Sequence, residues 1–582
     1  MISLKDFKLL LKTYNLGSSS DKKYLNKCII FIVFSGISDG LFLLFGTNFI
    51  INLLTGNYNS NLIGTYFPIL ENLPPVLPFL IIVGANLYLR QKSTKMIPFA
   101  SARIINTISI KILSNSLSQD IEFADQDKSS SKISSIALQT DLAGTSVISP
   151  SLRALAAIFS TILIFISMCL IDIKTTLISL TLLITCYFSI FNYYKPKLNK
   201  ISERFVKQKA KLINALQECY LGSRYIRIYD TADLEINYVR NIDKELRQNH
   251  ARQEYIGMLP RIQIESLIFF FLGSFGIYRS FQGFTATNFT DSFITLGIGG
   301  LKILPMLQQI YHGIHSFTSF KKSLEEVVSR ASENNTNKLK IKSYKDIKKV
   351  TEILNPKKDF KDISKIELKK VSYSRSNNQI VFQDINHTFE KGFINLIKGA
   401  SGKGKTTLLD ITSAIRQPTN GDILINDKYL CREGKIVDFE IWEKWKKSLG
   451  FAGQRPYIKD VSVMDNIYYG SEKINDIDID IEEILYFSCL DKTCGYEKSW
   501  LKRRCGENGS LISGGQALRI GLARAMLYSK NIIILDEPTS GLDSITQNLF
   551  FERITELSQK KLIIMTIHRE DTSISKSTLL EI

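Results

Sequence analysis

A glycine-rich segment, residues 399–407, has the residue types that hold phosphate groups in proteins. Its glycines allow the backbone to curl so that successive N–H groups point at one anion. Lys405 is placed to reach the β- and γ-phosphates of a nucleotide, and the hydroxyl of Thr406 suits Mg²⁺. The expected phosphate-binding set is Gly399, Ser401, Gly402, Lys403, Gly404, Lys405, Thr406 and Thr407. An apolar run before it, 393–397, predicts the strand–loop–helix context that such a loop requires.

A second apolar run, 532–535, predicts a buried parallel strand, and it ends in Asp536-Glu537. Asp536 suits Mg²⁺, directly or through water, and Glu537 suits the general base that deprotonates an attacking water. His568 follows a third predicted strand and is a candidate to hold the γ-phosphate or the water, although a single histidine in that place is ordinarily structural. The pattern therefore predicts ATP hydrolysis with Mg²⁺, with Lys405, Glu537 and His568 as catalytic residues.

The first half of the chain has a different character, because it contains nearly all of the long apolar runs. A helix needs about 20 apolar residues to cross a bilayer. Six stretches reach this length, and they are residues 27–54, 73–91, 152–172, 175–194, 262–283 and 291–313. Lys and Arg gather in the segments 92–150 and 195–254, which places both on the cytoplasmic side. An even number of crossings then predicts a multi-pass protein of the cytoplasmic (inner) membrane with both termini in the cytoplasm.

Four ionisable residues fall inside or at the edge of these stretches: Asp39, Arg261, Glu265 and Lys302. Charges there are costly and usually face a cavity or a partner. Arg261 and Glu265 are one helical turn apart, so they form either a structural pair or a substrate contact. Asp39 and Lys302 are candidates to line a polar path. The first 25 residues carry five lysines and an amphipathic run, which predicts a helix on the inner face of the bilayer.

Composition narrows the function classes. The net charge of +18 is compatible with nucleic-acid binding, but no basic stripe is interleaved with aromatic residues, and the charge gathers between apolar runs. The expected partners are therefore a lipid bilayer and a transported substrate, not nucleic acid. Eight cysteines are scattered without a C-x-x-C pair, which argues against a metal or redox role.

Together these motifs resemble those of the ATP-binding cassette (ABC) transporters, in particular exporter-type half-transporters with six membrane helices fused to one nucleotide domain. Residues 511–516, Leu-Ile-Ser-Gly-Gly-Gln, look like the family's signature motif, which implies nucleotide contacts for Ser513, Gly514, Gly515 and Gln516. Gln454 matches the glutamine loop that contacts Mg²⁺, and Asp543 matches the D-loop. Residues 505–509 resemble the exporter-specific X-loop, with Asn508 in place of the usual arginine. Gly222-Ser-Arg-Tyr-Ile226 lies where such exporters have their second coupling helix.

The resemblance implies an α-helical transmembrane domain with six helices and long cytoplasmic extensions, followed by an α/β P-loop NTPase domain of the ABC type. We expect an interfacial helix over 1–25, the membrane domain over 26–330, a linker over 331–365 and the ATP-binding domain over 366–582. The metal ligands would be Thr406, Gln454 and Asp536. The adenine-stacking position aligns with Arg375, and Tyr373 is the alternative.

The same resemblance implies two ATP molecules held between two nucleotide domains, so that one chain needs a second half-transporter. A homodimer suffices, and a heterodimer is also open. The expected function is ATP-driven export or flipping of a lipid, lipid-linked sugar, peptide, siderophore or drug. An ATP-gated channel or a regulatory protein without pumping is the alternative. A soluble ATPase that acts on DNA or ribosomes shares the ATP motifs but does not explain six apolar stretches.

Overall fold

A computed structural model describes most of the chain as two compact units. The first unit contains the helices from Leu4 to Ser332, and the second contains all the strands that the structure describes, from Lys365 onward. The described residues are 4–55, 76–117, 135–171, 173–281, 286–332, 363–375, 379–446, 448–469, 481–491, 495–529, 531–567 and 577–582. Most of the predicted linker 331–365 and the residue His568 lie outside these ranges.

Each of the six predicted apolar stretches overlaps one long helix of the first unit, and residues 73–75, 172 and 282–283 of these stretches lie outside the described ranges. These helices are α2 (Ser19–Thr55), α4 (Val76–Leu117), α8 (Ser149–Ile171), α9 (Ile173–Leu221), α11 (Ala232–Phe281) and α12 (Ala286–Ser332). Shorter elements are α1 (Leu4–Leu16), η2 (Ser135–Gln139), α7 (Thr140–Leu142), η3 (Ala143–Ile148) and α10 (Ser223–Ile228). Within the described part of the chain, three segments are by length and composition apolar enough to cross a membrane: Ser19–Thr47, Val76–Leu117 and Ile136–Ile171.

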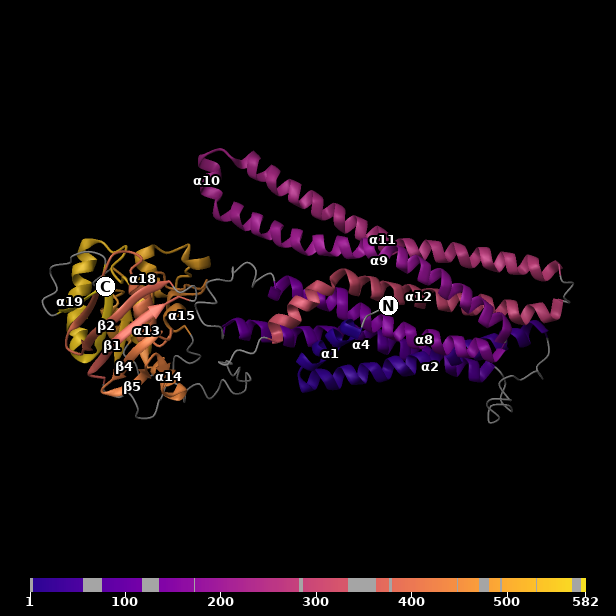
Figure 1. Cartoon of the computed structure of the whole chain (residues 1–582), viewed down its shortest axis with the longest axis horizontal. Coiled ribbons are helices and arrows are strands. Elements are labelled where there is room, and N and C mark those ends of the chain that lie inside the picture. Colours follow the sequence, from indigo (N-terminus) through magenta and orange to yellow (C-terminus); the bar gives the residue numbers. More distant parts are fainter. Residues whose placement is uncertain are drawn as a thin grey trace. The chain divides into compact units, whose positions relative to one another are not determined.

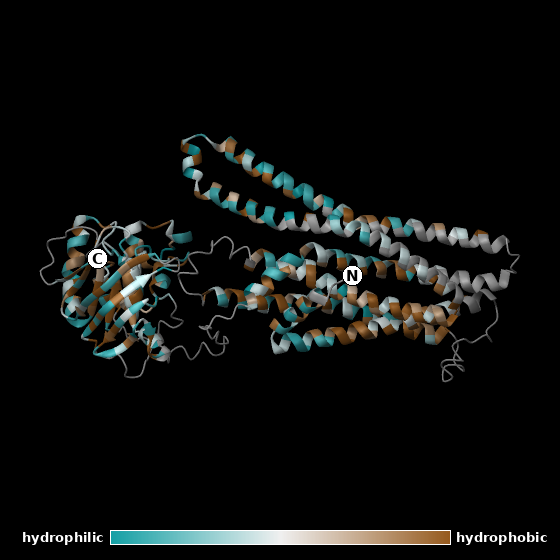
Figure 2. Cartoon of the chain, in the orientation of Figure 1, coloured by the Kyte–Doolittle hydropathy of each residue, from teal (hydrophilic) through white to brown (hydrophobic). Residues whose placement is uncertain are grey.

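The long helices continue well beyond a bilayer. Helix α9 has 49 residues, which corresponds to about 74 Å at 1.5 Å per residue, against about 30 Å of hydrocarbon. Helices α9 and α11 run side by side and are joined by the short α10 (Figure 1). Hydrophobic residues are frequent along the helices of the first unit (Figure 2), and α8 packs along α2 and α12.

Helix α1 packs on the side of this bundle. Leu9 and Leu10 face the core that α4 and α12 share, and Asp6 forms an ion pair of 2.7 Å with Lys321 of α12. Phe7 and Leu11, one turn apart, remain exposed. An amphipathic helix therefore forms over Leu4–Leu16, but residues 19–25 of the predicted segment belong to α2. The exposed apolar residues of α1 point away from the helices that it packs on.

The second unit contains two sheets. The antiparallel sheet has the order β2-β1-β4-β5-β6 and the parallel sheet the order β10-β3-β9-β8-β7. The strands are β1 (Lys365–Ser374), β2 (Ile380–Glu390), β3 (Ile394–Lys398), β4 (Asn420–Ile425), β5 (Lys428–Arg432), β6 (Lys435–Ile436), β7 (Leu449–Ala452), β8 (Ile532–Leu535), β9 (Leu562–Ile567) and β10 (Ser577–Glu581). Strands β8 and β9 are buried along their whole length, as expected for central strands of a parallel sheet.

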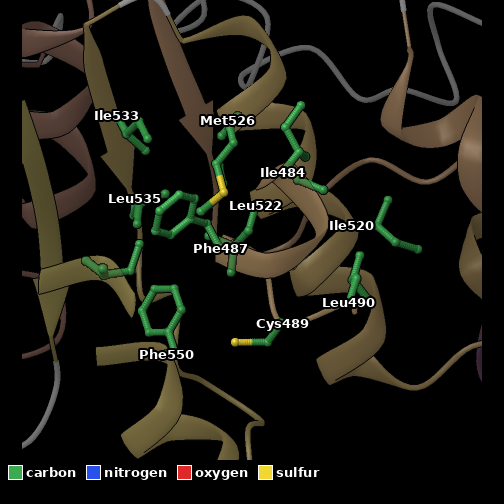
Figure 3. Packing of buried hydrophobic residues seen from close by; sticks show 14 of the residues in the cluster. Ile484, Phe487, Cys489, Leu490, Ile520, Leu522, Met526, Ile533, Leu535 and Phe550 are labelled. Atoms are coloured by element: carbon green, nitrogen blue, oxygen red, sulfur yellow. The ribbon is translucent and has the colours of Figure 1, made fainter. Parts of the chain in front are cut away.

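Helices cover the parallel sheet and fix the loops at its edge. They are α13 (Lys405–Thr412), α14 (Phe439–Lys446), α15 (Val463–Ile467), α16 (Ile481–Phe487), α17 (Lys498–Leu501), α18 (Gly514–Tyr528) and α19 (Ser544–Lys560). Figure 3 shows Phe487, Leu522 and Met526 packed beside Leu535 of β8, with Phe550 of α19 below them. This core holds the end of β8 in place, and the carboxylates of Asp536 and Glu537 follow directly.

One side-chain hydrogen bond anchors the far end of α13. Trp445 of α14 is fully buried, and its indole N–H donates to the carbonyl oxygen of Thr412 at 2.9 Å. Thr412 is the last residue of α13 and Lys405 is the first. The helix that follows the glycine-rich loop is thus fixed at its C-terminal end by a tryptophan.

Candidate nucleotide site

The glycine-rich loop joins β3 to α13 as the sequence predicts. Gly402 and Gly404 have φ angles of +81° and +96°, in the left-handed region that favours glycine. A Cβ on Gly404 would also lie 2.6 Å from Val381 Cγ1, so the position has no room for a side chain. The Lys405 ammonium group donates to the Gly399 carbonyl oxygen at 2.7 Å, across the loop. Its charge therefore lies at the concave backbone where a phosphate would bind.

Two predicted Mg²⁺ ligands meet although 130 residues separate them. The Thr406 hydroxyl donates to Asp536 Oδ2 at 2.8 Å. Asp536 is buried, and its other oxygen, Oδ1, accepts from the Thr566 hydroxyl at 2.7 Å. A hydroxyl and a carboxylate are hard oxygen ligands of the kind that Mg²⁺ uses together with water and substrate phosphates. The residues present thus fit a Mg²⁺ ion brought in with a nucleotide.

The candidate general base lies beside this pair. Gln454 Nε2 donates to Glu537 Oε2 at 2.6 Å. The backbone N–H of Glu537 donates to the Thr566 hydroxyl oxygen at 2.8 Å, and Glu537 has a φ of +49°. A left-handed non-glycine residue directly after a buried strand is strained, and such strain gathers at functional sites. The turn brings the Glu537 carboxylate to the predicted glutamine.

Thr566 is a part of this site that sequence reasoning missed. Its hydroxyl donates to Asp536 and accepts from the Glu537 backbone, so it links the two acidic positions. It is the one polar residue of β9, where every position is buried. A lone hydroxyl in an otherwise apolar, fully buried strand is the signal that would have identified it, because a buried polar group requires partners.

The Ser513–Gln516 segment begins α18 with a capping box. The Gln516 backbone N–H donates to Ser513 Oγ at 3.2 Å, and the Ser513 backbone N–H donates to Gln516 Oε1 at 2.9 Å. Ser513 and Gly514 are exposed, whereas Gly515 is buried, where a Cβ would lie 2.8 Å from the Gly541 carbonyl oxygen. The N-terminus of a 15-residue helix is therefore exposed and free of bulky side chains.

Asp543 caps the N-terminus of α19 next to that segment. Its Oδ1 accepts from the Thr546 backbone N–H at 2.9 Å, and its Oδ2 accepts from the Thr546 hydroxyl at 2.8 Å. The backbone hydrogen bond from Thr546, followed by the hydroxyl hydrogen bond, lowers the pKa of Asp543 below its ordinary value. Asp543 is consequently held as a carboxylate, and its loop is rigid at the helix start.

The two candidates for adenine stacking differ in exposure. Tyr373 is buried against Phe382, and its hydroxyl accepts a hydrogen bond of 2.8 Å from Arg416. No open face of that ring remains for a base, so the burial argues against Tyr373. Arg375 follows the end of β1 and is exposed. Arg375 is accordingly the better placed of the two.

Fold and site together define a P-loop nucleotide-binding domain fused to a bundle of long apolar helices. Residues 382–540 match the family described as "ABC transporter". The chain is 29% identical over 297 residues to the "Heterocyst differentiation ATP-binding protein HepA" of Nostoc sp., which covers 51% of this chain and 45% of that protein. It is 29% identical over 202 residues to the "Multidrug resistance ABC transporter ATP-binding and permease protein" of Lactococcus lactis, with coverages of 35% and 33%.

A solved structure resembles the whole fold. "Structure of a bacterial Atm1-family ABC exporter with ATP bound" matches with a TM-score of 0.72 at 13% identity, covering 96% of this chain and 93% of that one. The chain spans about half or less of the length of the curated relatives named above. The predicted fold class is confirmed: the chain has the fold of an exporter-type half-transporter, a domain of long apolar helices fused to an ATP-binding domain, and residues 382–540 match the ABC transporter family.

Proposed function

We propose that this protein is an ATP-driven exporter or flippase that works as a dimer in the cytoplasmic membrane. The observation that carries the proposal is the hydrogen-bonded set of Thr406, Asp536, Thr566, Glu537 and Gln454 at the ends of β3 and β8. These side chains come from four separate segments and combine a hard-cation site with a carboxylate that has the position of a base. Such a set serves ATP hydrolysis, and the apolar helices of the first unit are what that hydrolysis would move.

In this proposal the protein mainly positions charge. The backbone of the glycine-rich loop and Lys405 would bind the β- and γ-phosphates, while Thr406, Asp536 and Gln454 would hold a Mg²⁺ ion that offsets the phosphate charge. Glu537 accepts a proton from the water that attacks the γ-phosphorus, and Gln454 orients that water. His568, as the sequence suggests, would contact the γ-phosphate. The bond to the β–γ bridging oxygen breaks, and ADP leaves with inorganic phosphate.

Two exposed features support a second copy of the chain. The N-terminus of α18 presents the Ser513 hydroxyl and the Gly514 N–H, which suit the γ-phosphate of a nucleotide bound to the other copy. The turn between α9 and α11 exposes Tyr225, Ile228 and Tyr229, with the two tyrosine rings stacked at 6.3 Å. An apolar tip on a long helical arm is costly in water and is typical of a docking element. We infer that the second copy is identical, and a different half-transporter is the alternative.

The membrane orientation follows from the charge bias of the sequence. The lysine- and arginine-rich segments 92–150 and 195–254 face the cytoplasm, which also places both termini and the ATP-binding domain there. A gated channel without pumping is a second candidate that shares the same fold. Accumulation of substrate against a gradient in inside-out vesicles separates the two, because a channel only equilibrates it.

The test of the catalytic assignment is Glu537→Gln in the purified protein in nanodiscs. We expect ATP turnover to fall at least about 100-fold while ATP binding persists, because the base is lost but the phosphate contacts remain. Glu552→Gln, an exposed carboxylate on α19, is the matched control and should leave turnover unchanged. Unchanged hydrolysis by Glu537→Gln would remove Glu537 from the mechanism.

A further inference from the structure

A charged cluster lies within the helical unit, where α2, α4 and α12 meet. Lys302 Nζ is 3.6 Å from Asp39 Oδ1, and Asn86 Nδ2 donates to the same oxygen at 2.9 Å. The side chains of Lys302 and Asp39 are 17% and 2% exposed. Both residues fall near the middle of the apolar stretches predicted to cross the bilayer, 27–54 and 291–313. Ionisable residues at this depth are expensive and are by default candidates for a functional site.

The cluster is unbalanced in favour of positive charge. Asp39 has a hydrogen-bond donor in Asn86, whereas the Lys302 ammonium is buried and has no acceptor within hydrogen-bond distance among the described residues. Arg90, one turn from Asn86 on α4, is exposed and adds positive charge in the neighbourhood of Lys302. The unsatisfied group is a donor, so the missing complement is an acceptor with negative charge.

Three aromatic rings lie next to one another beside the ammonium group of Lys302. Lys302 Nζ lies 3.5 Å from the centroid of the Phe42 ring, a cation–π contact. Phe42 is 6.2 Å from Phe79, and Phe79 stacks on Phe49 at 4.9 Å. The three rings come from α2 and α4 and form one apolar surface that ends at the charge. This pairing of a cation with an aromatic surface matches a ligand with an acid group and an apolar body.

Glycine and proline residues of α12 close to Lys302 weaken the helix there. A Cβ added to Gly297 or Gly300 would meet nothing within 4 Å among the described residues, so this face borders open space. Pro305 has no N–H, and the Leu301 carbonyl four residues earlier therefore lacks its helical donor. Membrane helices interrupted by glycine and proline are a known indicator of substrate sites. Lys302 lies between Gly300 and Pro305 in the sequence, so α12 has a helix-weakening residue on each side of it.

We propose that Lys302 binds the acid group, phosphate or carboxylate, of an anionic amphiphile that this protein transports, and that Phe42, Phe79 and Phe49 contact the apolar body. Asp39 and Asn86 hold the ammonium group in place when the site is empty. The proposal rests on the transport function proposed above and specifies its substrate class. The simpler account, an ion pair that only fastens α12 to α2, predicts that loss of either partner has the same effect.

The test measures binding of tritiated dodecyl phosphate to the full-length Glu537→Gln protein in phosphatidylcholine nanodiscs. Lys302→Gln should weaken binding about tenfold or more, and Lys302→Arg should largely restore it. Asp39→Asn should retain or increase affinity, because the competing carboxylate is gone. Lys197→Gln, an exposed lysine on α9, is the control and should not change binding. A similar loss in Lys302→Gln and Asp39→Asn would overturn the proposal in favour of a fastening ion pair.

Competition separates the possible sources of the acid group. Dodecanoate should displace dodecyl phosphate, whereas inorganic phosphate at equal concentration should not, because it has no apolar body. Stronger displacement by dodecyltrimethylammonium would refute an anion site. If a single variant fails to fold, the neutral pair Asp39→Asn/Lys302→Gln removes both charges without leaving either unpaired. Wild-type affinity in that double variant would also refute the proposal.

This measurement is independent of the catalytic assignment. Binding requires no hydrolysis, so the expected pattern at Lys302 stands even if Glu537→Gln proves fully active. In that case the proposed role of Glu537 as the general base is refuted, and the proposed binding site at Lys302 is still supported. Conversely, an inactive Glu537→Gln protein that binds dodecyl phosphate independently of Lys302 supports the ATPase and refutes the site.

Discussion

Thr566 links two acidic residues through one hydroxyl. It donates to the Asp536 carboxylate and accepts from the Glu537 backbone N–H, so the proposed metal ligand and the proposed general base are positioned by the same side chain. Glu537 follows β8 in a strained left-handed conformation. The hydrogen bond from its backbone N–H to Thr566 helps to hold this conformation. At the residue scale, the catalytic geometry therefore depends on a group with no direct role in the reaction.

Replacing Thr566 with valine keeps the shape and removes the hydroxyl. The Glu537 N–H loses its acceptor and Asp536 loses a donor, at a cost of roughly 1–3 kcal/mol for each buried group left unpaired. We expect ATP turnover to fall about tenfold or more and the dependence on Mg²⁺ concentration to shift upward. Thr566→Ser should restore both. Steady-state ATPase assays over a Mg²⁺ series test this, and normal Mg²⁺ dependence in Thr566→Val would contradict it.

His387 on β2 gives a prediction about pH. Burial lowers the pKa of His387 below its ordinary value of 6.5. The unfolded chain therefore binds a proton at His387 more readily than the folded one, and this contribution to stability is present above pH 6.5 and is lost as the pH falls through the folded pKa. His387→Gln should show a smaller decrease in Tm between pH 7.5 and 5.5 than the wild type. An equal decrease in both proteins would exclude this role.

Individual residues of the candidate nucleotide site differ in how well the sequence predicts their positions. The glycine-rich loop between β3 and α13 was predictable because its glycines, Lys405 and Thr406 are adjacent in sequence and the loop depends on local backbone geometry. The choice between Tyr373 and Arg375 was not, because residues two apart on a strand are expected on the same face of the sheet. Only the end of β1 at Ser374 separates the buried ring from the exposed guanidinium group. Exposure at the end of a strand is a tertiary property.

At the scale of elements, Asn395 joins four segments of the ATP-binding unit. It is fully buried in β3, where its side chain pairs with both backbone groups of Glu390, with the Ile563 carbonyl and with the Thr578 hydroxyl. The strand that leads to the phosphate loop is thereby fixed to β2, β9 and β10. An asparagine inside an apolar run is thus a structural clamp.

Asn395→Leu should destabilise the ATP-binding unit strongly. The Glu390 backbone groups would be left buried without partners, at roughly 1–3 kcal/mol each. Gln383→Leu, an exposed position on β2, is the control and should change stability little. Thermal unfolding of the two variants, followed with and without ATP, tests the difference. A wild-type Tm in Asn395→Leu would contradict the clamp.

The positions of the six long helices were predictable from hydropathy, whereas their long extensions were expected from the family resemblance. Apolar runs mark where a helix crosses the bilayer, so the six stretches located α2, α4, α8, α9, α11 and α12. Hydropathy says nothing about where a helix ends in water, and α9 and α11 extend far beyond their apolar parts. The packing of α1 on α12 through Asp6 and Lys321 was equally hidden, because an ion pair between distant residues leaves no local pattern.

At the scale of the whole molecule, the composite site predicts contact between two chains. In a background without the native cysteines, Ser401→Cys in the phosphate loop and Ser513→Cys at the start of α18 should cross-link between subunits. The yield should rise with ATP in the Glu537→Gln protein, where hydrolysis does not reset the pair. Ser401→Cys with Lys560→Cys, an exposed site at the far end of α19, should not cross-link. No ATP-dependent product from the first pair would refute a shared site.

The aromatic tip of the α9–α11 arm leads to a second prediction at this scale. Tyr225→Ala/Tyr229→Ala removes the stacked pair from α10 without touching the nucleotide residues. We expect ATP hydrolysis to persist while transport in vesicles falls about tenfold or more, because the arm no longer transmits movement. Tyr238→Ala, also exposed but on the shaft of α11, should retain transport. Full transport by the double variant would show that the tip has no coupling role.

Trp445, which is hydrogen-bonded to the C-terminal end of α13, is an intrinsic fluorescent probe of the ATP-binding unit. All three tryptophans of the chain, Trp442, Trp445 and Trp500, belong to the ATP-binding unit. Trp445 reaches the phosphate loop through a single helix of eight residues. We therefore expect intrinsic emission to change when nucleotide binds, while the bundle of α2 to α12 contributes no tryptophan background. In a variant in which phenylalanine replaces Trp442, Trp445 and Trp500, a single tryptophan introduced into that bundle would report conformational change in the helical unit separately.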